Sequence, residues 1–419
     1  MSVQTDNSDG PMEFDPFDPA TERLGPAAFA ALAQQAPVAK VDERFDFFIA
    51  SDPAYIRDVI FRDTSIWTSE LGVVPSEHPK GLVTRMMQDN SDHLKVRRII
   101  QRGFSPAELK RLAEVVDEIL DELLDEISAI PEGQGDLFQL LAMPLPSRLM
   151  CRMLGAPEQD YLMYKAWADQ YFFAINNDPN KTAEGRFADM QQVAQALFAL
   201  IAERRALLAT KGLVPDISLV GTELPDDFLS RFMCEKIADE YIDDVEILSL
   251  MSAIILGGNE TTMNLIGNLL WRLLQVPERW EAVKADPALI DVAIEESLRL
   301  DPPVLGMCRT PRHDVSVAGH TIPAGTKTFY NISAVNRDPA MWDNPDEFRL
   351  DRPLSSLKRH ASFCGGERLC LGAPLARMEV RMIVDKLVAR FPKLRLVGEP
   401  DQCPGFNVWG KSSLPVAWR

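Results

Sequence analysis

The spacing of hydrophobic and polar positions along the chain predicts a protein made mostly of helices. Apolar residues recur every three to four positions over long stretches, the period that places them on one face of a helix. The helices expected from this pattern span 26–35, 53–61, 92–103, 106–129, 136–154, 158–175, 184–210, 226–237, 243–275, 277–285, 289–300 and 373–387. Between 205 and 226 the pattern weakens, and we expect a long connection there to which the sequence assigns no role.

Short runs with strand character lie nearer the two ends of the chain. They span 36–49, 314–331 and 404–418, and Pro323-Ala324-Gly325 marks a turn within the second run. Because helices dominate the middle of the chain and strands are few, the expected fold class is α+β, mainly α. Residues 1–20 are acidic and contain proline, which predicts a flexible N-terminal tail.

Composition describes an acidic protein with enough apolar residues for a large core. The 419 residues are 46% hydrophobic, and the formal net charge of −18 argues against nucleic acid as a partner. The N-terminus lacks the features of a signal peptide, and the longest apolar segment, near 247–256, is too short for a transmembrane helix. Six scattered cysteines fit a reducing cytosol. We therefore expect a cytoplasmic protein without a membrane anchor.

Basic residues gather in one stretch of this acidic chain, between His93 and Arg111. The cations that follow His93 there are Lys95, Arg97, Arg98, Arg102, Lys110 and Arg111, against the single acid Glu108. Such a strip is more often a solvated helix face. Its alternative role is a docking site for an acidic partner, because complementary charge raises the association rate.

The most specific chemical feature is Cys370, which lies on a glycine-rich loop directly before a predicted helix. The run from Phe363 to Gly372 reads FCGGERLCLG. A helix N-terminus favours a thiolate through its dipole and free N–H groups, and glycines let a large flat group approach the backbone. A thiolate held in this way can bind a haem iron. Two alternatives are a buried structural cysteine and a thiol hydrolase, although no histidine is tied to Cys370 in sequence.

A second feature lies inside the apolar helix predicted over 243–275. Gly257 and Gly258 each cost about 1 kcal/mol there relative to alanine, which suggests that something lies against the helix backbone. Glu260 and Thr261 then bring a carboxyl and a hydroxyl into an apolar setting, a pair suited to relaying protons. The structural alternative is a kinked core helix whose threonine bonds to a backbone carbonyl.

Two weaker patterns carry little information when taken singly. Glu296 and Arg299 are three residues apart and can pair on one helix face, but any surface helix can show this spacing. The cations with chemistry suited to binding carboxylates are His93, Arg97, Arg309 and Arg368. A surface position is the ordinary explanation for any one of these cations.

Together, and in this order, these motifs resemble the cytochrome P-450 family of haem-thiolate monooxygenases. The family signature is Phe-Gly-x-Gly-x-(His or Arg)-x-Cys-x-Gly, and the residues that match it are Phe363, Gly366, Arg368, Cys370 and Gly372. Cys364 replaces a usual glycine, which affects the turn rather than the ligand. The motifs extend from residue 93 to 372, so the resemblance covers nearly the whole chain. It implies a soluble bacterial-type protein in which residues 21–419 form a single helix-rich domain with small β-sheets.

The resemblance also implies a role for each candidate residue. Cys370 is expected to be the axial ligand of haem b (iron protoporphyrin IX), and the residues expected to border the haem are Phe363, Gly366, Gly257 and Gly258. The cations expected at its propionates are His93, Arg97, Arg309 and Arg368. Thr261 is expected to stabilise bound dioxygen, and Glu260 to help deliver the protons that break the O–O bond. A buried network behind the haem loop is expected to contain Glu296, Arg299 and Arg352.

The implied reaction hydroxylates a hydrophobic small molecule (a terpenoid, steroid, fatty-acyl or aromatic compound) with dioxygen and two electrons. An iron–sulfur ferredoxin and its ferredoxin reductase are expected to supply the electrons, with the dock at Lys95, Arg98 and Arg102. By analogy, the residues expected to line the substrate pocket are Leu82, Val83, Ala253, Leu256, Val304, Leu305 and Val408. We expect a monomer. A non-enzymatic haem sensor or carrier is the alternative, but it leaves Glu260 and Thr261 without a purpose.

Overall fold

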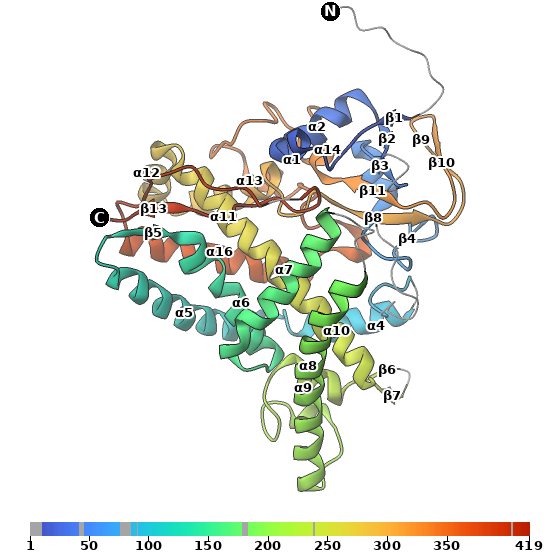
Figure 1. Cartoon of the computed structure of the whole chain (residues 1–419), viewed down its shortest axis with the longest axis vertical. Coiled ribbons are helices and arrows are strands. Elements are labelled where there is room, and N and C mark those ends of the chain that lie inside the picture. Colours follow the sequence, from blue (N-terminus) through green and yellow to red (C-terminus); the bar gives the residue numbers. More distant parts are fainter. Residues whose placement is uncertain are drawn as a thin grey trace, which may run out of the picture.

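Helices fill most of the computed structural model, which describes residues 11–41, 46–75, 85–89, 91–177, 183–237, 239–403 and 405–419. The strands of the main sheet gather at one corner, and helices occupy the rest (Figure 1). The helices are α1 (Pro19–Leu24), α2 (Pro26–Gln35), α3 (Pro53–Tyr55), α4 (Ser91–Arg102), α5 (Pro106–Ala129), α6 (Pro144–Leu154), α7 (Tyr161–Asn177), α8 (Ala183–Lys211), α9 (Phe228–Cys234), α10 (Asp244–Gly258), α11 (Glu260–Leu274), α12 (Pro277–Ala285), α13 (Leu289–Leu300), α14 (Ile332–Asn336), α15 (Leu354–Leu357) and α16 (Ala373–Arg390).

The helix predictions are confirmed over most of their length, and α5 shows the physical reason. Its bounds are those predicted from residue spacing alone, 106–129. Ser105 caps the helix by accepting the Glu108 N–H at 3.4 Å, and Pro106 occupies the first turn, where its missing N–H costs nothing. The apolar residues at helical spacing, from Leu112 to Ile127, are the ones that the structure buries. Local pattern and packing therefore agree in this helix.

Other predicted helices are shorter or divided. The segment 136–154 contains a π-helical turn at Phe138–Ala142 before α6, and the segment 226–237 ends at Cys234. The long helix predicted over 243–275 is broken at Asn259, between α10 and α11. The predicted 205–226 connection begins later, because α8 continues to Lys211.

The prediction of a flexible tail over residues 1–20 is wrong for residues 11–20. Met12–Glu13 forms β1, which pairs in parallel with β2, and α1 begins at Pro19 with Asp18 as its cap. Two aromatic contacts fix this segment to the rest of the protein. The Phe14 ring packs on Phe29 and the Phe17 ring on Phe406, with ring centroids 5.5 and 4.8 Å apart.

The main sheet has six strands in the order β1-β2-β3-β11-β8-β4. The strands are β1 (Met12–Glu13), β2 (Val38–Lys40), β3 (Phe48–Ala50), β4 (Trp67–Thr68), β5 (Gln134–Asp136), β6 (Lys236–Ile237), β7 (Glu240–Tyr241), β8 (Gly306–Pro311), β9 (Val315–Val317), β10 (His320–Ile322), β11 (Thr328–Asn331), β12 (Arg395–Leu396) and β13 (Pro415–Ala417). The strand β11 pairs in parallel with β3 and antiparallel with β8, with Phe329 opposite Ile49 and Cys308. The runs predicted from strand character cover β2, β3 and β11 of this sheet, but not β1, β4 or β8.

The largest hydrophobic core lies among the long helices, with buried residues from α5, α6, α10, α11, α13 and α16. In Figure 1, α10 and α11 follow one another diagonally through this helical part. Two smaller apolar clusters lie at the β-sheet, one on Trp67 and Tyr330, the other on Phe29 and Phe406. Within the ranges described above, no helix combines the length and the apolar composition that crossing a bilayer requires.

Candidate active site

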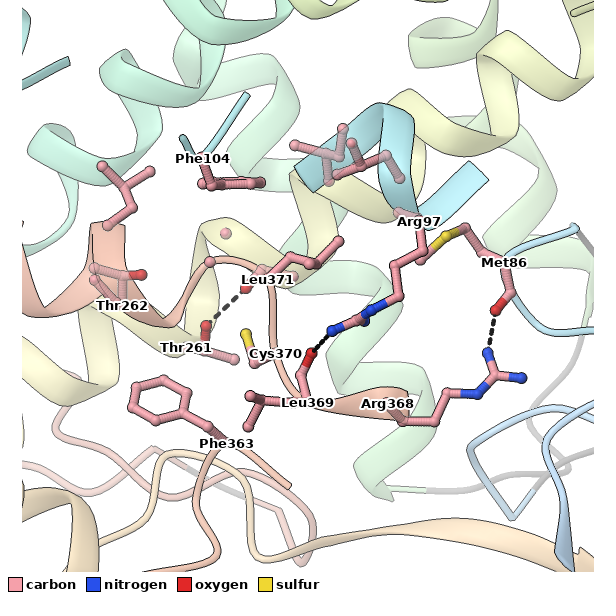
Figure 2. A pocket seen from close by; sticks show the side chains of 18 of the residues that line it. Met86, Arg97, Phe104, Thr261, Thr262, Phe363, Arg368, Leu369, Cys370 and Leu371 are labelled. Atoms are coloured by element: carbon pink, nitrogen blue, oxygen red, sulfur yellow. Dashed lines mark hydrogen bonds between the residues drawn. The ribbon is translucent and has the colours of Figure 1, made fainter. Parts of the chain in front are cut away.

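A cavity of about 270 Å³ lies between α10–α11 on one side and the 363–372 loop with the start of α16 on the other. Its walls are completed by α4 and α6 (Figure 2). The residues that line it are Met86, His93, Arg97, Ile100, Phe104, Met150, Ala253, Ile254, Gly257, Gly258, Thr261, Thr262, Phe363, Arg368, Leu369, Cys370, Leu371, Gly372, Leu375, Ala376 and Glu379. The structure therefore brings together the predicted cysteine loop and the predicted glycine–threonine segment across one space.

The loop before Cys370 is held by its own backbone and by a neighbouring segment. The Cys370 N–H donates to the Phe363 carbonyl at 3.0 Å. Gly366 has φ +62°, and a Cβ there would lie 2.1 Å from the Phe61 carbonyl oxygen. Gly366 is thus required by the contact with Phe61, and it is not among the residues that line the cavity.

The Cys370 thiol is exposed to the cavity (Figure 2). Burial raises the pKa of this thiol, while the N–H groups of Gly372 and Ala373, at the start of α16, act in the opposite direction. Arg97 also favours the thiolate. The predicted helix-terminus effect is present, but it is weaker than burial. Binding of a metal cation by the sulfur would displace the proton.

Opposite Cys370, the break between α10 and α11 exposes backbone and a hydroxyl. Ser147 donates its hydroxyl to the Asn259 side-chain oxygen at 2.8 Å, which anchors the break. Thr261 lines the cavity and donates its hydroxyl to the Gly257 carbonyl at 2.7 Å. The kinked-helix alternative is therefore seen in this bond, and the predicted role of Thr261 with dioxygen stays a prediction.

The two glycines of this segment have different roles. A Cβ at Gly257 would meet nothing within 4 Å, so this position faces open space. A Cβ at Gly258 would lie 2.5 Å from the Met150 sulfur, so this glycine also permits the packing of α10 against α6.

Glu260 does not line the cavity, although it directly precedes Thr261. Its side chain is buried among α7, α11 and the C-terminal segment. The Lys165 Nζ lies 3.6 Å from Glu260 Oε2, and the Cys403 sulfur lies 3.9 Å from Oε1. Burial raises the pKa of Glu260, and Lys165 opposes this rise. Neither Lys165 nor Cys403 had a signal in the sequence that linked it to Glu260.

Three of the four predicted propionate-binding cations border the cavity along one edge. Arg97 donates to the Leu369 carbonyl at 2.5 Å, and Arg368 pairs with Asp89 at 2.5 Å. The Arg368 Nη1 lies 2.9 Å from the His93 Nδ1. Arg309 is absent from the cavity lining because its guanidinium is buried over the Tyr330 ring, 5.4 Å from the centroid. Its predicted role at a propionate stays a prediction.

The structure brings Glu296, Arg299 and Arg352 together behind the loop. Glu296 and Arg299 form a two-bond pair, with N–O distances of 2.7 and 2.8 Å, and both side chains are fully buried. Arg352 Nε donates to Glu296 Oε1 at 3.1 Å. Arg299 also donates to the backbone carbonyls of Asn336 and Pro345, so the pair ties α13 to the segment that precedes the Cys370 loop.

One of the residues predicted to line the substrate pocket is found at the cavity. Ala253 lines the cavity, but Leu256, Val304, Leu305 and Val408 do not. Val304 and Val408 pair with each other in a short β-bridge, and Leu305 is buried in the aromatic cluster at the sheet. Leu82 and Val83 lie outside the described residues. The apolar lining that the sequence did not single out includes Met86, Ile100, Phe104 and Met150, which look like ordinary core residues in sequence.

The basic strip on α4 is largely neutralised by neighbouring acids. Lys95 pairs with Asp92 at 3.0 Å, and Arg102 pairs with Glu235. Arg98 is exposed and makes no ion pair with any residue in the described part of the chain.

The cavity residues fit a haem group. A soft sulfur ligand stands on one wall, and Gly257 leaves open space on the opposite wall. Arg97, Arg368 and His93 supply donors for carboxylates at one edge. Arg97 and Arg368 would hold the propionates, and Cys370 would hold the iron.

Comparison with known proteins agrees with this fit. The family profile described as "Cytochrome P450" matches residues 46–407. The chain is 32% identical to cytochrome P450 monooxygenase PikC of Streptomyces venezuelae, over 79% of this chain and 75% of the relative. It is 29% identical to a steroid C26-monooxygenase of Mycolicibacterium smegmatis, over 85% and 84%. A solved structure of a P450 EryK mutant in complex with erythromycin B superimposes with a TM-score of 0.79 at 28% identity, covering 93% of this chain and 95% of the other.

Profile, relatives and fold agree with a cysteine thiol facing a glycine–threonine helix break across one cavity. Members of the matched family bind haem through a cysteine thiolate and use it to activate dioxygen. The chain therefore belongs to the cytochrome P450 family and is a bacterial-type haem-thiolate monooxygenase.

Proposed function

We propose that Cys370 holds the haem iron and that the enzyme hydroxylates a hydrophobic small molecule. The observation that carries the substrate class is an apolar wall from α4, the turn after it, α6 and α10, formed by Ile100, Phe104, Met150, Ala253 and Ile254. A polar group moved from water to such a wall without a hydrogen-bond partner costs about 2–7 kcal/mol. Bound haem supplies the activation of dioxygen. The protein positions the substrate, excludes water and delivers protons.

Among hydrophobic substrates, a steroid- or macrolide-sized molecule is the first choice. The relatives support it: one is named a steroid C26-monooxygenase, and the EryK structure holds erythromycin B. Terpenoid, fatty-acyl and aromatic compounds remain the other candidates. Burial of hydrocarbon surface against this apolar wall is favourable by about 25 cal/mol per Å², for the carbon skeleton of any of these compounds.

Thr261 is proposed to manage protons within the cavity. Its hydroxyl donates to Gly257 O, which leaves the Oγ1 lone pairs free to accept a hydrogen bond from a water or a protonated group in the cavity. When the hydroxyl rotates away from Gly257, it becomes a donor toward the cavity. Oγ1 can thus accept a proton and pass one on without a change of backbone.

Glu260 is proposed to supply those protons from outside the cavity. Lys165 contacts both Glu260 and Asp169: its Nζ is 3.6 Å from Glu260 Oε2 and forms a salt bridge with Asp169. The Asp169 side chain is 48% exposed, so this ionic chain runs from solvent to the first turn of α11. Glu260 would then act through the helix break beside Thr261.

An external ferredoxin is the proposed electron donor, and the face outside the Cys370 loop is its proposed dock. Arg98 remains a candidate there because it makes no ion pair among the described residues. Arg62, Lys358 and Arg359 are exposed cations that line a separate hollow of about 450 Å³ beside Cys364. The net charge of −18 repels an acidic protein elsewhere, so a local cationic face would direct its approach.

Two measurements on the purified holoenzyme test the proposal. The reduced, carbon monoxide-bound protein is expected to show the strongly red-shifted Soret band of a thiolate haem, and Cys370→Ser is expected to lose it, since serine lacks the soft sulfur. A band retained by Cys370→Ser would refute the assignment of Cys370, and Cys364→Ser is the matched control that should keep it.

The substrate class is tested by titrating a panel of steroids, macrolides, terpenoids, fatty acids and aromatic compounds while recording the low- to high-spin haem shift. Oxidation of NADPH through a ferredoxin and its reductase, with formation of hydroxylated product, is expected only with compounds that give the shift. A haem sensor or carrier would show the shift without product.

A further inference from the structure

A second buried ionic group lies behind the Cys370 loop, next to the Glu296 network but separate from it. Its centre is Glu295 on α13, which is 3% exposed. Arg377, on α16, donates to both oxygens of Glu295, through Nη2 to Oε2 at 2.9 Å and through Nε to Oε1. His360 completes the group, with its Nε2 3.0 Å from Glu295 Oε2. None of these residues belongs to the signature that binds the iron.

The charges of this group are defined by its hydrogen bonds. The His360 Nδ1 accepts the Ser362 N–H at 3.2 Å, so Nε2 carries the proton and donates it to Glu295. Burial lowers the pKa of His360, which keeps it neutral. Burial opposes ionisation of Glu295, but the bonds from Arg377 and His360 outweigh it and lower the pKa to about 2. The group is therefore one carboxylate paired directly with one guanidinium, and the neutral imidazole donates a further hydrogen bond to the carboxylate.

Both partners of Glu295 also contact Phe363, the first residue of the loop. The Arg377 guanidinium lies over the Phe363 ring, 4.5 Å from its centroid, and the His360 ring lies 5.8 Å away. The Phe363 carbonyl in turn accepts the N–H of Cys370 at 3.0 Å. A continuous set of contacts thus joins the Glu295 carboxylate to the backbone of the residue that bears the sulfur.

Arg377 also reaches the outer side of the loop. It lines a hollow of about 310 Å³ together with Phe363, Cys370 and Lys358. Its side chain is 33% exposed, whereas that of Glu295 is 4% exposed. The positive member of the pair therefore lies toward the sulfur and the protein surface, and the negative member lies deeper, within the helices.

We propose that Glu295 and Arg377 are a positioning pair that orients Phe363 against the Cys370 loop and sets the electrostatic potential at the sulfur. In the holoenzyme this pair tunes the reduction potential of the haem iron. The inference rests on Cys370 being the haem ligand, but it does not depend on the substrate or on the electron donor proposed above.

The charges predict shifts of opposite sign, which a merely structural role would not produce. One added electron makes the haem site more negative, so a nearby positive charge favours the reduced state. Arg377→Met removes the positive charge and is expected to shift the potential negative. Glu295→Gln removes the negative charge, leaves Arg377 uncompensated and is expected to shift the potential positive. The double variant is expected to return close to the parent.

The experiment is a spectroelectrochemical titration of the holoenzymes without substrate or ferredoxin. Arg381→Met is the matched control, because Arg381 lies one turn later on α16 and pairs with Asp291 and Asp385 at the surface. Its potential is expected to stay at the parent value. Arg377→Lys keeps the charge but loses the planar contact with Phe363, so its shift is expected to be smaller than that of Arg377→Met.

Shifts of the same sign in Arg377→Met and Glu295→Gln, or shifts no larger than in Arg381→Met, would overturn the proposal. The double variant keeps it testable if one single substitution abolishes folding, because removal of both charges leaves no unpaired ion. In that case a double variant whose potential differs clearly from those of the parent and of Arg381→Met would also overturn it. Loss of the thiolate Soret band in the parent would instead refute the assignment of Cys370.

Discussion

Glu379 is a buried carboxyl group whose protonation can be tested through the pH dependence of stability. It lies on α16 at the cavity wall, and its side chain is 2% exposed. Its Oε2 is buried without a hydrogen-bond partner among the described residues. Burial alone raises the pKa of Glu379 from 4.5 to about 8. The folded protein thus holds this carboxyl in its neutral form at neutral pH, and the unfolded chain does not.

The sign of the effect on stability follows from proton counting. Between pH 4.5 and 8 the folded state binds one proton at Glu379 that the unfolded state releases, so the free energy of unfolding falls as pH rises. The slope is about 1.4 kcal/mol per pH unit at most, or roughly 2.7 kcal/mol from pH 5.5 to 7.5. Glu379→Gln removes this proton and is expected to flatten the dependence by that amount.

The assay is urea denaturation of the parent and variant holoenzymes, followed by tryptophan fluorescence at half-unit steps from pH 5.5 to 7.5. The quantity to compare is the difference in the free energy of unfolding between the two proteins at each pH. Asp385→Asn is the matched control, since Asp385 is an exposed carboxylate on the same helix, and its curve is expected to run parallel to the parent. Parallel curves for the parent and Glu379→Gln would refute the reasoning, because Glu379 would then carry the same number of protons in both states.

Three further predictions address other parts of the molecule. Thr261→Ala is expected to leave haem and substrate binding nearly intact but to divert electrons into peroxide or water; unchanged coupling of NADPH oxidation to product would remove Thr261 from the mechanism. Cys364 has φ +60°, where a side chain costs about 1–2 kcal/mol, so Cys364→Gly is expected to be more stable than Cys364→Ala by about 1 kcal/mol in urea denaturation, and equal stability would contradict this. Arg98→Glu is expected to slow the first electron transfer from an acidic ferredoxin and to weaken its salt dependence, since such attraction is screened over about 8 Å at physiological salt. Stopped-flow reduction checks this, with Lys284→Glu on α12 as the control, and equal rates and salt slopes in all three proteins would mean that Arg98 is only part of a solvated helix face.

Local sequence determined the features that depend on neighbours along the chain. The bounds of α5, α12 and α13 follow from apolar spacing, because a helix is stabilised by contacts three and four residues apart. The pairing of Glu296 with Arg299 is local in the same sense. The glycine-rich loop and its cysteine were also recognisable, since haem ligation needs a particular residue type at a particular spacing. The thiol of Cys370 does face the cavity as expected.

Only the tertiary structure decided which side each of these groups faces and what it meets. Glu260 and Thr261 are adjacent, yet one lies against Lys165 and the other against the cavity, because the break at Asn259 and the packing of α7 set their directions. Gly366 is required by the Phe61 carbonyl, from a segment some 300 positions earlier in the chain.

Arg309 and Glu379 are two further residues whose surroundings were decided by the tertiary structure. Arg309 lies over Tyr330, on the adjacent strand β11, rather than at the cavity. Glu379 looks like an ordinary helix-surface acid in sequence, and the fold makes it a buried carboxyl. Burial and charge pairing depend on distances between segments that no local pattern contains. The sequence by itself therefore identified the reactive groups, and tertiary packing decided the environment, and hence the ionisation, of each.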